Sequence, residues 1–351
     1  MSKVAEDVFF SEAFRRNEQE RAHWQREVLN ELIALKSENG VNTLGIQMLE
    51  NICENQDLAN KLEQHTMETG NDIFSNVIIK SYLAVEPNEE VRDLISKMWI
   101  GLWDAPEAIN AGINTEPYYD GSFLIRFTSD LQILLRKVVE LFTTEVFALN
   151  LATAQGNIPK IFKHMLAIEL HDIQQEDNEM GVMNLIDLLP GDMREGYNLV
   201  FEYAFLASCA FVIFHEIGHQ VQKNEKLAKY FDIPLHCTTD TNEDCLKSEN
   251  NADLIGMKIV KKIFGENEAI SWLGYSGILL CLLALSISST NPTIDTDHPS
   301  IQSRYRSAIK FILDAYGTQA NKEIIFRTNA VAKLLTYVAK WDVEDWWENL
   351  L

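Results

Sequence analysis

The chain has 351 residues, 46% of them hydrophobic, so it is long enough to bury a large core in one domain or two. It carries 52 acidic and 30 basic side chains, for a formal net charge of −22. A surface this acidic repels nucleic-acid phosphates and anionic lipid headgroups. We therefore expect no nucleic-acid partner and no membrane-surface partner.

The cysteines and the first residues both point to a reducing compartment. The five cysteines are odd in number and lack the short spacings of a secreted disulfide framework. The first residues lack a basic segment followed by an apolar one, so no secretory signal is expected. We expect the protein in the cytoplasm.

Helical periodicity dominates the N-terminal part. Residues 5–37 predict one or two amphipathic helices, residues 41–83 further helices, and residues 89–103 another. Residues 104–121 are rich in Asn, Gly, Pro and Asp and predict a loop. We place a domain boundary there, between an N-terminal helical region, residues 1–115, and a second domain, residues 116–351.

The second domain should begin with a strand. Phe123, Ile125 and Phe127 alternate with Leu124, Arg126 and Thr128, which is the period of a β-strand. This strand could be an edge that accepts an extended substrate, or an ordinary core strand. A helix is expected over residues 129–142, whereas residues 147–151 and 158–168 are ambiguous.

Long helices should dominate the rest of the chain. Pro190, Gly191 and Asp192 break the chain ahead of a helix that continues to Gln222, and the last hundred residues read as helices. Residues 269–289 are long enough to cross a bilayer, but their serines and glycines and the absence of flanking basic residues favour a core helix. We therefore predict a mainly α fold with a small β-sheet beside the active-site helix.

One short motif carries the chemistry. An apolar run leads into His215-Glu216-Ile217-Gly218-His219, and histidines four residues apart share one face of a helix. That spacing can aim two imidazole nitrogens at one zinc ion, and Glu216 can take a proton from zinc-bound water. Gly218 is a weak helix former, so small size near the metal is a plausible reason for it.

A zinc site needs a third protein ligand, and residues 248–258 offer one. Glu249 and Asp253 lie four residues apart on a predicted helix, which Ser248 could cap. Two acidic residues at this spacing are usually a solvated face, but the apolar residues around them indicate a packed helix. We assign Glu249 as the third ligand, and Asp253 as the acceptor that holds a zinc-bound histidine by its other ring nitrogen.

The motifs HEIGH, ENNAD and DHPSIQSR, in this order, resemble the gluzincin family that includes the CAAX prenyl endopeptidases and the HtpX-type peptidases. The resemblance covers about residues 201–306 and implies an α+β zincin-like domain. It also implies that His298 stabilises the transition state and that Arg304 braces the acidic helix. A weaker similarity, resting on size, HExxH and solubility, is to the phage-exclusion Lit-type peptidases, which act on a specific protein inside the cell.

Two other histidine groups have weaker claims to function. His236, Cys237 and Cys245 could hold a structural zinc, although no CxxC pair is present. His164 and His171 lie seven residues apart and could share a helix face, but surface histidines are the simpler interpretation.

We therefore expect an intracellular zinc metallopeptidase that hydrolyses peptide bonds of a protein substrate through a metal-activated water. The competing hypothesis is a zinc-binding sensor or interaction module without turnover, against which the intact Glu216 argues. A third possibility, a membrane-embedded peptidase, depends on residues 269–289. The N-terminal helices, or residues 223–247, are expected to restrict access to zinc.

Overall fold

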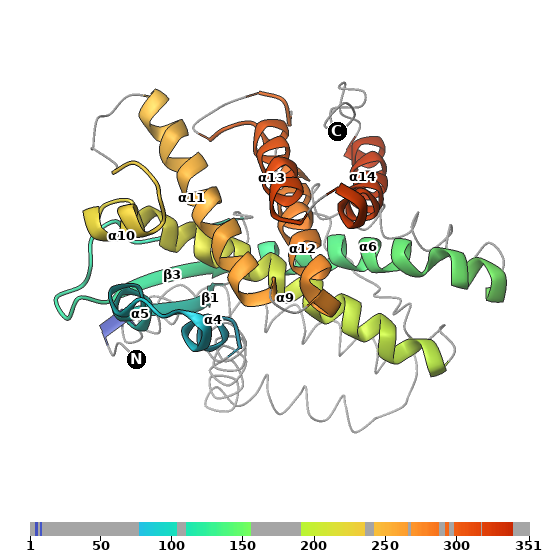
Figure 1. Ribbon diagram of the computed structural model, residues 1–351, viewed down its shortest axis with the longest axis horizontal. Coiled ribbons are helices and arrows are strands. Elements are labelled where there is room, and N and C mark those ends of the chain that lie inside the picture. Colours follow the sequence, from blue (N-terminus) through green and yellow to red (C-terminus); the bar gives the residue numbers. More distant parts are fainter. Residues whose placement is uncertain are drawn as a thin grey trace, which may run out of the picture.

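The computed structural model describes residues 4–5, 8, 77–103, 110–155, 191–235, 242–265, 268–287, 292–294, 298–316 and 318–339. This part of the chain is mostly helical, with one three-stranded sheet at one side of the helices (Figure 1). The predicted fold class, mainly α with a small sheet, is confirmed.

The described elements follow one another along the chain as α4 (Lys80–Val85), α5 (Glu89–Ser96), β1 (Met98–Trp103), β2 (Ala111–Ile113), β3 (Phe123–Thr128), α6 (Ser129–Gln155), α9 (Gly191–Val221), α10 (Glu225–Tyr230), α11 (Asn242–Phe264), α12 (Glu268–Ile287), α13 (Ile301–Tyr316) and α14 (Thr318–Ala339). The long helix predicted after Pro190 is α9. Residues 147–151, which were ambiguous, belong to α6, so that helix extends well beyond residue 142.

The sheet has the strand order β1-β3-β2, with β1 parallel and β2 antiparallel to β3. The predicted strand is confirmed as β3, but it lies in the centre, so the interpretation of it as an edge is wrong. Leu124 is as fully buried as Ile125, because a central strand packs on both faces. Within the described sheet, the edge that lies near α9 belongs to β2.

Two sequence interpretations fail at this sheet. The helix predicted over residues 89–103 ends at Ser96, because the apolar and aromatic residues after it pair with β3, beginning with Met98 opposite Phe123. The loop predicted over residues 104–121 contains β2. The sheet takes strands from both sides of the boundary expected at residue 116, since β1 and β2 precede that residue and β3 follows it. The division into two domains stays a prediction.

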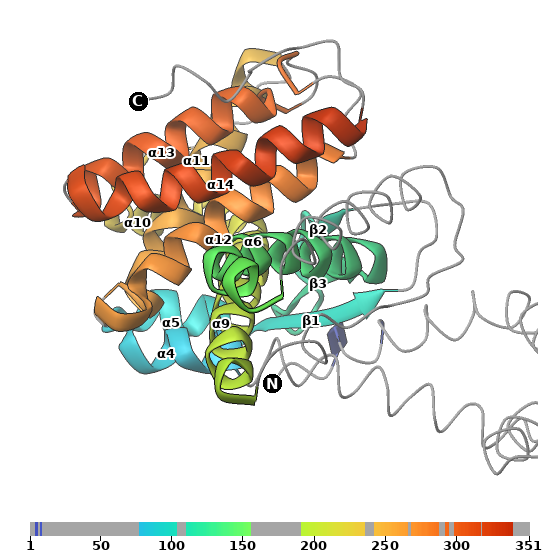
Figure 2. The same cartoon turned by 90° about the vertical axis from the view of Figure 1, so that its right-hand side faces the viewer.

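The helices stack beside the sheet, with α12 in their middle (Figure 2). Helices α9 and α12 cross closely at Gly277, where a Cβ would lie 2.5 Å from the Ala207 Cβ. Ser208 Oγ donates to the Gly277 carbonyl at 2.9 Å across the same crossing. A glycine here lets α12 pack tightly against the helix that carries the HEIGH motif.

Two helical stretches, Met193–Val221 and Ile270–Ile287, are long and apolar enough by composition to cross a membrane. Both are largely buried, and the second contacts α6, α9, α11, α13 and α14. Core helices pass the same test of length and composition, so the two stretches are weak evidence for a span. The burial of α12 agrees with the core-helix interpretation of residues 269–289.

Several sequence predictions lie outside the described residues. These are most of the N-terminal helices, the segment 158–168, and the residues His164, His171, His236 and Cys237. Among the described cysteines, Cys209 and Cys281 are buried free thiols and Cys245 is exposed.

Candidate metal centre

His215, His219 and Glu249 come together where α9 crosses α11. The two Nε2 atoms of the histidines lie 3.3 Å apart. Glu249 Oε2 lies 3.3 Å from His215 Nε2, and Glu249 Oε1 lies 3.4 Å from His219 Nε2. The structure therefore brings the three predicted ligand residues into one cluster that could hold a metal ion.

The local fold explains why these side chains meet. His215 and His219 are one helical turn apart near the end of α9 and face α11. Gly256 on α11 permits the close crossing, because a Cβ there would lie 3.1 Å from the Phe211 ring. Ser248 does not cap this helix as predicted: α11 begins at Asn242, so Ser248 lies inside it.

The spacing of the three side chains fits a tetrahedral metal ion. Four ligands at 2.0–2.1 Å from zinc lie about 3.3 Å from one another, which matches the distances between these three side chains. Glu249 Oε2 is also buried, and the polar atoms beside it are His298 Nδ1 at 2.9 Å and His215 Nε2 at 3.3 Å, both on rings that can be neutral. A buried carboxylate oxygen in this state is costly unless a cation binds it.

The charge around the cluster favours a divalent cation as well. Glu216, Glu249 and Asp253 are largely buried together, whereas Arg304 is the buried cation beside them. Burial lowers the pKa of His219 to about 4, so its neutral ring can donate a lone pair to a metal. The site has the donor atoms and the negative charge that a divalent metal requires.

Asp253 and Arg304 support the first histidine from behind. Asp253 Oδ1 lies 2.8 Å from His215 Nδ1, which leaves His215 Nε2 facing the cluster. Arg304 Nε and one of its terminal nitrogens donate to the two oxygens of Asp253, both at 2.7 Å. Burial alone would raise the pKa of Asp253, but the interactions with Arg304 and His215 outweigh the effect of burial and lower the pKa to about 2. The structure thus brings Asp253 and Arg304 together behind His215, and their roles at a bound metal stay a prediction.

The same interactions act on His215. Burial alone would lower its pKa, but the hydrogen bonds to Asp253 and Glu249 outweigh burial and raise it to about 10. The surroundings of His215 therefore demand positive charge, which either a proton or a metal ion can supply.

Glu216 lies in the same cavity as the three candidate ligands. Burial raises its pKa to about 7, and a hydrogen bond from the Ile113 backbone partly opposes that rise. A carboxylate with a pKa near neutrality is suited to accept and return a proton. The contact with Ile113 was not foreseen, because no motif marks the short strand β2.

His298 stands at the rim of the cavity, with more than half of its side chain exposed. Its Nδ1 lies 2.9 Å from Glu249 Oε2. This contact raises the pKa of His298, which favours the protonated, hydrogen-bond-donating ring. The structure thus places His298 beside the predicted metal ligands but more exposed than they are.

The cavity in front of these residues has a volume of about 520 Å³. One wall carries the candidate ligands, Glu216 and His298, and the start of β2 contributes Ala111. Much of the rest is apolar and comes from α6, α9, α12 and the start of α13: Leu131, Phe211, Val212, Leu285 and Ile301. Nothing in the sequence pattern indicated that these residues line a cavity.

Residues 173–339 match the family model Peptidase U49, which describes Lit-type metallopeptidases. The match covers just under half of the chain and includes all three candidate metal ligands. It supports the weaker of the two resemblances seen in the sequence, and gives no support to the CAAX prenyl endopeptidases or the HtpX-type peptidases. No curated protein and no solved structure matches the chain.

Proposed function

We propose that this protein is a zinc-dependent endopeptidase that cleaves an intracellular protein substrate, and that it works in the cytoplasm. One observation carries the proposal: His215, His219 and Glu249 converge at metal-ligand spacing in a cavity that also contains Glu216. The match to Peptidase U49 supports the peptidase activity.

The charged and imidazole side chains of the site each have a task in peptide hydrolysis. His215, His219 and Glu249 would hold the metal, and a bound zinc ion supplies Lewis acidity for attack on a carbonyl. Glu216 takes a proton at its carboxylate from the attacking water and passes it to the leaving amine. His298 donates a hydrogen bond to the developing oxyanion. Arg304 holds Asp253, and Asp253 fixes the ring of His215.

The surroundings suit a peptide substrate. The apolar wall of the cavity can take an apolar side chain next to the scissile bond. Strand β2 begins at the same cavity, and an extended peptide could lie along its edge. The edge role that the sequence analysis gave to residues 122–128 therefore passes, in this proposal, to β2.

The first test separates metal binding from turnover. Elemental analysis of the wild type should give one zinc per chain, with strong loss in His215→Ala and in Glu249→Ala. Glu216→Gln should keep the zinc but lose at least about 10²-fold in kcat on an unstructured protein such as β-casein. Full turnover by Glu216→Gln would contradict the proposed mechanism, and zinc binding without turnover by the wild type would favour a sensor or interaction module.

A further inference from the structure

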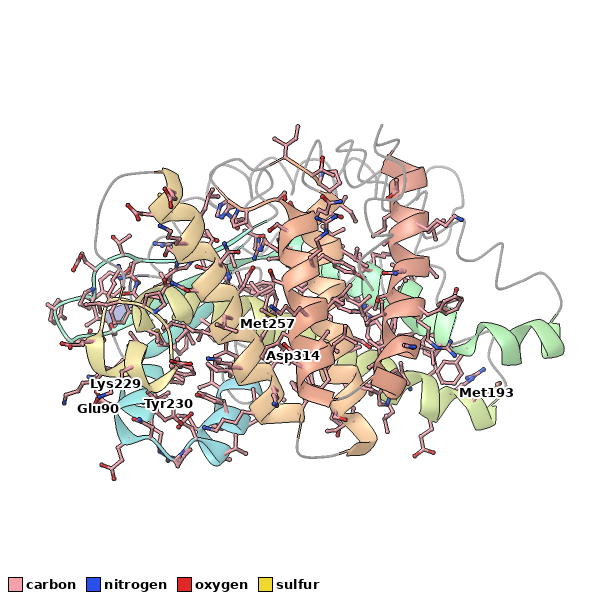
Figure 3. All side chains as sticks on the ribbon, turned by 45° about the horizontal axis from the view of Figure 1, so that its top comes forward. Glu90, Met193, Lys229, Tyr230, Met257 and Asp314 are labelled. Atoms are coloured by element: carbon pink, nitrogen blue, oxygen red, sulfur yellow. The ribbon has the colours of Figure 1, made fainter. Side chains whose placement is uncertain are left out.

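A second hollow, with a volume of about 760 Å³, lies between α5, the segment that joins β2 to β3, and the start of α10. We name it the α5–α10 groove. Figure 3 labels Glu90 on α5 and Lys229 and Tyr230 on α10, and the Lys226–Glu90 ion pair at 2.8 Å joins these two helices. None of the residues assigned to catalysis lines this groove.

The α5–α10 groove and the catalytic cavity are lined by nearby residues of the same two segments. His219 lines the cavity, and Gln220, the next residue, lines the groove. Ala111 at the start of β2 lines the cavity, and Thr115 just past its end lines the groove. A peptide that follows β2 away from the candidate metal ligands would run toward the α5–α10 groove.

The end of α9 and the turn after it hold the chain between the two hollows. Gln220 Nε2 donates to the Asn114 carbonyl at 2.9 Å, and Lys223 Nζ donates to the Thr115 carbonyl at 2.7 Å. These carbonyls follow β2 directly, and each already accepts one hydrogen bond, which leaves it less available to a substrate strand. The substrate would leave the strand edge at this point and enter the groove.

The lining of the groove carries excess negative charge. It contains five carboxylates and three lysines, and all three lysines are already engaged: Lys97 with Asp93, Lys226 with Glu90, and Lys223 with the Thr115 carbonyl. Three carboxylates form no ion pair within the described residues, and they come from three different segments: Glu89, Glu116 and Glu225.

The groove also offers apolar surface to a long side chain. Leu94, Pro117, Phe123 and Leu227 line it together with the carboxylates. Lysine and arginine lay their aliphatic stems on such surface while their charged ends reach carboxylates. A ligand rich in phosphate or carboxylate would be repelled.

We propose that the α5–α10 groove binds a basic segment of the protein substrate, about five residues from the scissile bond, a spacing given by the length of strand between the two hollows. This inference rests on the proposed peptidase function and adds a substrate class to it: an extended chain with lysine or arginine at that distance. Binding there would hold the substrate in register before cleavage.

Binding can be tested without turnover, in the full-length Glu216→Gln protein. The probes are two fluorescent peptides that differ only in carrying three lysines or three glutamines. At low salt, anisotropy should show the lysine peptide binding about five- to thirtyfold more tightly. The variant Glu89→Gln/Glu116→Gln/Glu225→Gln should lose this preference. Equal binding of the two peptides by the parent protein would overturn the proposal.

A matched variant controls for bulk charge. Glu195→Gln/Glu202→Gln/Asp314→Asn removes the same number of exposed carboxylates from α9 and α13, and Figure 3 shows Asp314 on α13, away from α5 and α10. It should keep the preference for lysine. A benzophenone on the lysine peptide should crosslink to α5, residues 114–121 or α10. Equal loss in both triple variants, or crosslinks elsewhere, would overturn the proposal.

Cleavage by the wild type separates this proposal from the peptidase function. Mass spectrometry of β-casein digests should show lysine or arginine enriched about five residues from the cut bonds, and less so with the groove variant. Lysine-selective binding without cleavage would leave the groove as a site for basic peptides and refute the peptidase function. Cleavage without lysine-selective binding would refute the groove alone.

Discussion

Gly218 of α9 packs directly against Ala252 of α11, and a Cβ at position 218 would lie 2.9 Å from the Ala252 Cα. This contact lies one residue before His219 and one before Asp253. The small residues within HEIGH and ENNAD thus let the two helices approach until His219 and Glu249 face each other. The sequence analysis attributed Gly218 to space near the metal, whereas the structure shows contact between helices.

Gly218→Ala should therefore weaken metal binding. The added methyl group meets backbone, so α9 and α11 must separate by some tenths of an ångström, and overpacking of this kind costs about 1–3 kcal/mol. We expect zinc affinity to fall at least about tenfold, measured by competition with a chromophoric chelator. Gly112→Ala is the matched control, since nothing lies within 4 Å of its added Cβ. Equal affinity in Gly218→Ala and wild type would show that the crossing tolerates the methyl group.

Asp253→Asn should lower both metal affinity and stability. The change removes the carboxylate that holds His215 and leaves Arg304 as a buried charge without its partner. Loss of the carboxylate behind a metal-binding histidine typically lowers metal affinity 10–100-fold. An uncompensated buried charge typically lowers the free energy of unfolding by about 3–5 kcal/mol. Elemental analysis and urea unfolding measure the two effects.

The double variant Asp253→Asn/Arg304→Met separates these effects. Removing the charge of Arg304 as well should recover part of the unfolding free energy, because no buried charge then stands alone. It should not recover the zinc affinity, because His215 still lacks its carboxylate. Recovery of both properties would show that Asp253 serves the packing of Arg304 only.

The sequence predicted the candidate site better than it predicted the sheet. Spacing alone placed His215, His219 and Glu216 on one helix, since the helical period relates neighbours in sequence to neighbours in space. Assigning Glu249 as their partner needed the packed character of residues 248–258, and the family resemblance agreed with it afterwards. The contact of Arg304 with Asp253 joins residues 51 positions apart, and only the resemblance predicted it.

The sheet shows why the rest could not be predicted. Strand β2 has three residues, too few for any periodicity, and it forms because Gly112 pairs with Arg126 of β3. In residues 98–103 apolar and polar residues do not alternate, because a strand that packs on both faces has apolar side chains on both of them. The α5–α10 groove joins segments more than a hundred residues apart, and local patterns carry no information about it.

His298→Ala should reduce turnover but keep the metal. His298 lies on the rim and contacts Glu249, so its removal leaves the three candidate ligands in place. Loss of one oxyanion donor costs about 10²–10³ in kcat. Zinc content and kcat on β-casein are the two measurements. If His298→Ala loses zinc as His215→Ala does, His298 is a ligand or a support for Glu249 and not a donor to the oxyanion.

A polar cluster at the far end of α11 should make stability depend on pH. The buried carboxylate of Glu86 accepts hydrogen bonds from Lys262 at 2.8 Å, Tyr230 at 2.8 Å, Tyr82 and the Asn88 backbone. Burial would raise the Glu86 pKa, but these donors outweigh it and hold the pKa below its usual value. Because the folded state favours the charged form, the stabilisation is present above the unfolded pKa and is lost as pH falls through the folded pKa.

Glu86→Gln should therefore destabilise the protein at pH 7 by about 1–3 kcal/mol, because the hydrogen bonds to a charged carboxylate are replaced by weaker ones to a neutral amide, while Lys262 is partly exposed to solvent. The difference from wild type should shrink below about pH 4.3, the ordinary pKa of glutamate. Urea unfolding at pH 7 and pH 3 measures both values. Glu90→Gln is the matched control: its ion pair with Lys226 is exposed and screened by solvent, so its loss should leave stability nearly unchanged at either pH. A Glu86→Gln penalty that stays constant between pH 7 and pH 3 would mean that the charge of Glu86 contributes nothing and that the donors respond only to its shape.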